Sequence, residues 1–183
     1  MINCRIKYTY RDYINLPESE TDLYELIDGE LYMVPAPTPM HQTVSGNVYS
    51  AMRDFVSRRD LGAVFYSPID VVLSDHDVVQ PDIIFISKDR LGIVTERNVR
   101  GAPDLVIEIL SPSTAERDRT IKRARYLRFG VREYWLVDIQ AKSIEVLKAG
   151  QDEFETVRVY TQGSVLVSPV LEGFGMEIQS VFA

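Results

Sequence analysis

The chain of 183 residues is poor in cysteine and has no long hydrophobic run. Its one thiol, Cys4, cannot form an intrachain disulfide and has no partner for a thiolate metal site, so a zinc finger is excluded and oxygen ligands remain. No segment approaches the ~20 apolar residues that cross a bilayer, and residues 1–7 lack the apolar stretch of a secretory signal. We therefore expect a cytoplasmic protein that does not associate with membranes.

Positive charge is also scarce. The net charge of −7 argues against a protein that coats nucleic acid by bulk electrostatics. Residues 116–128 are the exception, with six basic and two acidic side chains, so this stretch is +4 and the remainder of the chain is −11. Arg119, Arg123 and Arg125 in this stretch are candidate contacts to a phosphate backbone, although a solvated helix face has a similar pattern.

The hydrophobic content of 45% suits a single domain, residues 1–183, with one substantial core. The pattern predicts an α/β fold with a mixed sheet: a short helix after Thr9 that ends by Pro17, a hairpin around Asp28-Gly29, and a parallel strand–helix–strand crossover at 105–138. The remaining predicted elements are a helix at 41–59, strands at 69–73 and 78–86, a polar irregular stretch at 91–101, a hairpin of 144–147 with 156–160, and an added edge strand at 165–167.

Glu108 is the most informative residue, because it interrupts the otherwise apolar run 105–110. A strand of this composition is buried on both faces, and an unpaired buried carboxylate costs several kcal/mol. A cation of the chain or a bound metal must hold that charge. A second acid, Asp82, begins the apolar run 82–86, so the two could converge where neighbouring strands lie roughly 5 Å apart.

Lys122 is the third candidate, because the helical period places it on one face with Tyr126 and Phe129. That face points toward the sheet, an unusual direction for lysine. Two acids and a lysine suffice for metal-dependent phosphodiester hydrolysis, in which Mg²⁺, or Mn²⁺ in its place, takes carboxylate and carbonyl oxygens. Asp82, Glu108 and the Ile109 carbonyl are the predicted ligands, with Lys122 beside the attacking water.

Other interpretations of the same residues stay open. Lys122 could simply neutralise Glu108 as a buried structural pair in a non-catalytic domain for nucleic-acid binding or assembly. His41 could bind phosphate or metal, but at a helix start capping or packing is the commoner role. Glu25 could be a third acid or an ordinary surface residue. A glycoside hydrolase with paired carboxylates ranks last, because a lysine between the acids suits phosphate chemistry better.

Several strings in the chain resemble the Uma-two family, restriction-endonuclease-like proteins of the PD-(D/E)XK nuclease superfamily. The matching strings are Tyr24-Glu25-Leu26-Ile27-Asp28-Gly29-Glu30, Val79-Gln80-Pro81-Asp82, the segment 103–113, Arg117-Asp118 with Lys122 and Tyr126, and the segment 130–138.

The resemblance implies a nuclease-like core sheet flanked by helices, followed here by additional C-terminal strands. It implies a site of Asp82, Glu108 and a lysine, makes Glu25 an accessory acid, and makes His41 a matched position. The superfamily lysine, two residues after the acid, would fall on Leu110, so Lys122 must supply it, as in the Uma-two pattern. We therefore expect a Mg²⁺-dependent DNA endonuclease that forms a homodimer.

Overall fold

The computed structural model describes residues 6–17 and 23–183, and Cys4 lies outside these residues. The helices are α1 (Tyr10–Tyr13), α2 (Pro39–Arg58), α3 (Ala115–Arg117), α4 (Arg123–Phe129) and α5 (Ile178–Val181), with a 3₁₀ helix at Lys88–Ile93 and a π-helical turn at Asp118–Lys122. The strands are β1 (Leu23–Ile27), β2 (Glu30–Val34), β3 (Gly62–Tyr66), β4 (Val71–Ser74), β5 (Asp77–Val79), β6 (Ile83–Ser87), β7 (Val99–Arg100), β8 (Leu105–Leu110), β9 (Glu133–Asp138), β10 (Ser143–Ala149), β11 (Phe154–Thr161), β12 (Val165–Val167) and β13 (Gly175–Glu177).

Two mixed sheets form the fold. The larger has the strand order β11-β10-β9-β8-β6-β3, and the smaller has the order β2-β1-β5-β4-β7. The pair β8 and β9 is parallel, which confirms the predicted crossover, and β4 and β7 form a second parallel pair. The predicted α/β class with a mixed sheet is confirmed, and the division into two sheets is a refinement of it.

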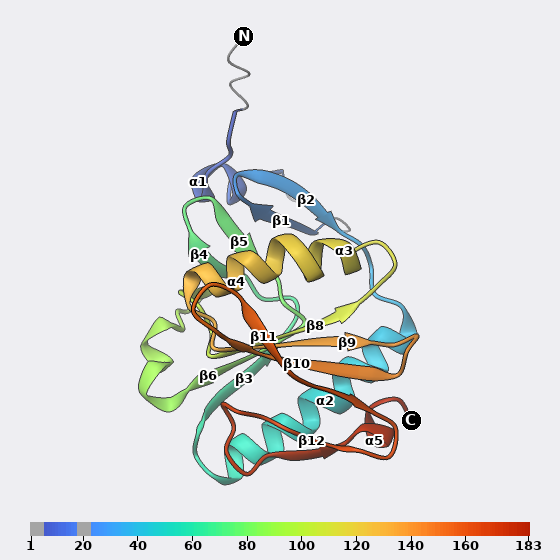
Figure 1. The fold of residues 1–183 in the computed structure, drawn as a ribbon. Coiled ribbons are helices and arrows are strands. Elements are labelled where there is room, and N and C mark those ends of the chain that lie inside the picture. Colours follow the sequence, from blue (N-terminus) through green and yellow to red (C-terminus); the bar gives the residue numbers. More distant parts are fainter. Residues whose placement is uncertain (1–5, 18–22) are drawn as a thin grey trace.

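Each face of the six-stranded sheet is covered by its own hydrophobic core. Trp135 and Val137 of β9 face the core beneath α2 and the C-terminal segment, whereas Tyr134 and Leu136 face the core beneath α4 and the smaller sheet. This alternation is the period of two expected of a strand buried on both sides. In Figure 1, α3 and α4 lie between the β1–β2 hairpin and the six-stranded sheet, and α2 lies on its opposite side.

The predicted hairpin and the first helix are both present. Ile27 pairs with Glu30 across a two-residue loop, and Asp28 and Gly29 have φ of 52° and 75°, the positive values that a type I′ turn requires. Thr9 caps α1 in a capping box with Asp12. Among residues 6–17 and 23–183, no helix combines the length and the apolar character needed to cross a membrane.

The strand predicted at 78–86 is wrong as a single element. It divides into β5 in the smaller sheet and β6 in the larger one, and Gln80-Pro81-Asp82 connects them. Pro81 has no N–H to contribute to a ladder, so the chain leaves one sheet there and enters the other. Asp82 therefore precedes β6 and does not lie within a strand.

Three other boundaries differ from expectation. The helix predicted from His41 begins at Pro39 with Thr38 as its cap, because proline is well tolerated in the first turn. The stretch 91–101 contains β7, which pairs with β4. The strand at 165–167 does not extend the large sheet, because it pairs with β13 in a separate two-stranded ladder.

Candidate active site

Lys122 lies at the centre of three carboxylates. Its side chain is 4% exposed, and its Nζ is 2.6 Å from Glu108 Oε1 and 2.8 Å from Glu25 Oε1. Asp118, one turn earlier, adds a third carboxylate at 3.7 Å. The predicted pairing of Lys122 with Glu108 is therefore present, and Glu25 belongs to the same cluster.

The cluster holds Lys122 in its charged form. Burial alone would lower the pKa of Lys122, but Glu108, Glu25 and Asp118 outweigh it and raise that pKa well above its ordinary value. Burial raises the pKa of Glu108, with Lys122 opposing and the neighbouring acids reinforcing the shift. Tyr126 donates a hydrogen bond of 2.5 Å to Glu108 Oε1 and fixes the carboxyl orientation.

Asp82 lies next to this cluster because of the register between β6 and β8. Ile83 pairs with Ile107 in antiparallel fashion, so the preceding residue, Asp82, is opposite Glu108. The Ile109 N–H donates to Asp82 Oδ2 at 2.7 Å, which holds the carboxylate against the edge of β8. Asp82 and Glu108 thus converge as the sequence predicted, although Asp82 reaches the site from a connection.

His41 reaches the same carboxylate from the first turn of α2. Its Nε2 is 3.4 Å from Asp82 Oδ1. Burial works to lower the pKa of His41, but the hydrogen bond and charge of Asp82 raise it on balance. The His41 side chain is 16% exposed, so it packs at the start of α2 and also lies beside the predicted acid Asp82.

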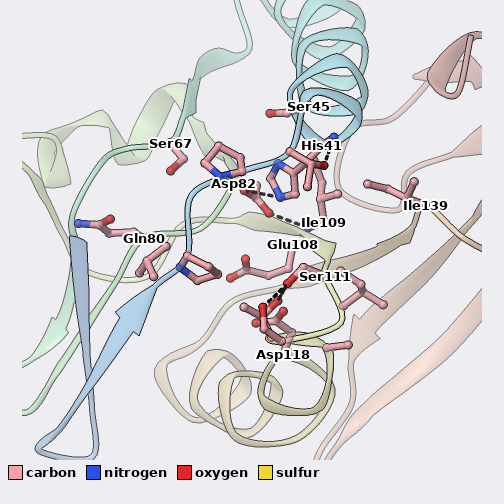
Figure 2. A pocket seen from close by; sticks show the side chains of 18 of the residues that line it. His41, Ser45, Ser67, Gln80, Asp82, Glu108, Ile109, Ser111, Asp118 and Ile139 are labelled. Atoms are coloured by element: carbon pink, nitrogen blue, oxygen red, sulfur yellow. Dashed lines mark hydrogen bonds and ion pairs between the residues drawn. The ribbon is translucent and has the colours of Figure 1, made fainter. Parts of the chain in front are cut away.

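An open pocket of about 870 Å³ is lined by Lys122, its three carboxylate partners, Asp82 and His41. Figure 2 shows His41 and Asp82 on one side of Glu108, and Asp118 and Ser111 on the other. The extended connection after β2 and the loop after β8 form two further walls, which include Pro35, Pro37 and Pro112. The acids are therefore buried by the protein and still reachable from solvent.

The donor set of the pocket is compatible with a hard divalent cation. Asp82, Glu108 and the backbone carbonyl of Ile109 supply oxygen atoms, which Mg²⁺ prefers at ~2.0–2.1 Å. Within the described ranges, no group of three or more His, Cys, Asp or Glu side chains is arranged to hold a metal ion. An open site completed by water needs only two carboxylates, so the residues fit Mg²⁺ in that form.

The three predicted nucleic-acid contacts have different surroundings. Arg119 borders the pocket with a side chain 43% exposed, and its ion pairs to Asp138 and Glu145 are both 3.4 Å long. Arg123 donates to the Phe154 carbonyl at 2.5 Å. Arg125 is 2.9 Å from Asp28 and 3.6 Å from Asp77, so Arg123 and Arg125 make structural contacts inside the chain.

Sequence reasoning missed Asp118, Arg117 and Gln80 as lining residues. Asp118 is 2% exposed and lies four residues before Lys122, a spacing that places the two on one helical face. That spacing was a usable signal. Gln80 lines the pocket and donates its backbone N–H to Glu25 Oε1 at 2.8 Å, a contact that depends on the break between β5 and β6.

Comparisons with known proteins identify the family and the fold. The Uma2 family, described as "Putative restriction endonuclease", matches residues 10–179. The chain belongs to the Uma2 family. A crystal structure described as a putative nuclease belonging to DUF820 from Anabaena variabilis is similar, with a TM-score of 0.79 and 24% sequence identity over 95% of this chain and 97% of that one. This likeness supports the shared fold, and no curated protein matches the chain significantly.

Proposed function

We propose that this Uma2 protein is a Mg²⁺-dependent endonuclease that hydrolyses DNA phosphodiester bonds. The observation that supports it most is a buried lysine 2.6 Å from Glu108, at the wall of an open pocket that Asp82 also lines. Acids and lysines whose pKa values are strongly shifted by burial and by charged neighbours concentrate at functional sites in clefts.

Each residue has a distinct role in this proposal. Asp82 and Glu108 bind the cation with the Ile109 carbonyl, and Glu25 keeps Lys122 protonated and oriented. When bound, Mg²⁺ supplies positive charge to the phosphoryl oxygens and lowers the pKa of its water. Lys122 orients the attacking water and offsets negative charge as the new P–O bond forms and the P–O bond to the leaving oxygen breaks. The attacking water gives up its proton to solvent, and the leaving oxygen takes a proton from solvent.

A second candidate is a non-catalytic domain in which Lys122 serves as a structural counter-ion. The observation favouring it is that three carboxylates already surround the lysine. In that case neither Asp82 nor Glu108 needs a cation, and the pocket would bind a ligand without cutting it.

Calorimetry with Mg²⁺ and Mn²⁺ separates the two candidates. The nuclease proposal requires that the wild type binds the cation and that Asp82→Asn and Glu108→Gln do not. It also requires that the wild type nicks supercoiled plasmid and that the same substitutions abolish nicking. Glu155→Gln, at an exposed position of β11 outside the pocket, serves as the control. Absence of both binding and nicking, with circular dichroism unchanged, would favour the structural pair. The proposed homodimer is tested by light scattering at micromolar concentration, where a monomer would count against it.

A further inference from the structure

One rim of the pocket exposes large apolar side chains. Tyr66, at the end of β3, is 58% exposed, and Met40, at the start of α2, is 48% exposed. Tyr49 packs edge-on against Tyr66, with ring centroids 4.7 Å apart and an interplanar angle of 61°. The Tyr66 ring is therefore held by a neighbour while much of its surface remains available to a ligand.

The opposite wall carries two arginines. The Nε of Arg117 is buried and has no hydrogen-bond partner within the described part of the chain. Its guanidinium lies 4.9 Å from the centroid of the Tyr32 ring, which fixes its position. Arg119 lies beside it in the pocket lining, with only the long contacts to Asp138 and Glu145. An unsatisfied buried donor next to a half-exposed guanidinium suits an anionic group.

The basic stretch 116–128 offers little to a DNA duplex. The net charge is −7, and within the basic stretch Lys122 is buried while Arg123 and Arg125 are engaged inside the chain. Duplex binding by phosphate neutralisation needs many clustered cations on one surface. A pocket of about 870 Å³ has the size of one that encloses a compact ligand, such as an unpaired nucleotide with its neighbours.

We propose that this pocket takes single-stranded DNA, with an unpaired base stacked on Tyr66 and the backbone phosphates directed toward Arg117 and Arg119. The proposal rests on the nuclease function above and names its substrate class. An aromatic platform beside arginine side chains is an arrangement by which single strands are bound without sequence readout. The strand then passes Asp82 and Glu108, which lie between the two walls.

Fluorescence anisotropy measures the Kd of the protein for one labelled oligonucleotide, first as a single strand and then annealed to its complement. EDTA is present so that no cleavage occurs. We expect the single strand to bind at least tenfold more tightly than the duplex. Tyr66→Ala should weaken single-strand binding about tenfold, the loss of one stacked base. Arg119→Ala should reduce the slope of log Kd against log salt concentration by about 0.7, the loss of one phosphate contact.

Tyr8→Ala and Arg128→Ala are the matched controls, because both residues are exposed and neither lines the pocket. They should leave the single-strand Kd unchanged. Equal or tighter binding of the duplex, or a Tyr66→Ala protein with wild-type Kd, would overturn the inference. Cleavage of plasmid in Mg²⁺ is measured separately, so a nuclease that prefers duplex would refute the single-strand assignment and leave the proposed function intact.

Discussion

Replacing Lys122 with methionine removes the one cation among three buried carboxylates while keeping most of the side-chain volume. The lysine is 3% exposed and lies within 2.8 Å of both Glu25 and Glu108. Removing one partner of a buried ion pair costs about 3–5 kcal/mol, because the remaining charge is left without compensation. Against a typical stability of about 5–15 kcal/mol, the variant should fold but be clearly weakened.

Urea unfolding followed by circular dichroism measures this loss. For a slope of about 2–3 kcal/mol per M, the midpoint should fall by roughly 1–2.5 M. Lys148→Met, the same substitution at an exposed position of β10, should change the free energy of unfolding by less than about 0.5 kcal/mol. Glu108→Gln combined with Lys122→Met should recover part of the lost free energy of unfolding, because one of the uncompensated buried carboxylates is removed.

The loss should also depend on pH. Burial raises the pKa of Glu108 and of Asp118, and removal of Lys122 withdraws the charge that opposes this shift. A carboxyl whose pKa is raised in the folded state favours folding when protonated, so its stabilisation is lost as the pH rises. The penalty should therefore be larger at pH 8 than near pH 5. A Lys122→Met protein within about 1 kcal/mol of wild type at pH 8 would refute the reasoning.

Three further predictions concern stability alone. Asp104 accepts from the Ser87 N–H at 2.8 Å and pairs with Arg90 at 2.8 Å; burial opposes these contacts, but they lower its pKa on balance. Asp104→Asn should lower the free energy of unfolding by about 1.5–3 kcal/mol at pH 7. The difference from wild type should shrink below about pH 4, because the wild-type carboxylate becomes protonated there. Urea unfolding at both pH values measures this. Tyr126→Phe should cost about 1–3 kcal/mol in the same assay, because Glu108 loses a buried donor at 2.5 Å; an unchanged midpoint would contradict this. Gly62→Ala should lower the thermal midpoint strongly, because the φ of Gly62 is +145° and a Cβ would lie 2.1 Å from the Ile86 carbonyl oxygen. The control Gly46→Ala, in open space within α2, should raise the thermal midpoint slightly.

Much of the fold could be predicted from local sequence. The Asp28-Gly29 hairpin, the apolar stripe of α2 and the β8–β9 crossover each depend on a pattern within one segment. The division of 78–86 between two sheets could not be predicted in this way, because either sheet can accommodate an apolar run. Proline at position 81 was a signal of an interrupted ladder that the single predicted strand at 78–86 did not use. The partners of β5 and β6 are set by tertiary packing.

Part of the site could also be predicted from local sequence. Glu108 and Lys122 stood out because each contradicts its own local environment, an acid in an apolar strand and a lysine on an apolar helix face. Asp118 was indicated only by its spacing of four residues from Lys122. Glu25 does not contradict its environment, so its approach to Lys122 appears only in three dimensions. Arg123 and Arg125 read as a basic surface in sequence, and only their partners show that they make contacts inside the chain.

The most direct test of the central claim is the rate of supercoiled-plasmid nicking in Mg²⁺ by the wild type and by Glu108→Gln combined with Lys122→Met. The combined variant keeps the volume of both side chains and regains part of the stability that Lys122→Met alone loses. The account predicts nicking by the wild type and none by this variant, with both proteins folded by circular dichroism. Equal nicking by the two would contradict the assignment of Glu108 and Lys122 to catalysis. Failure of the wild type to cut either the plasmid or a single-stranded oligonucleotide would favour a non-catalytic domain.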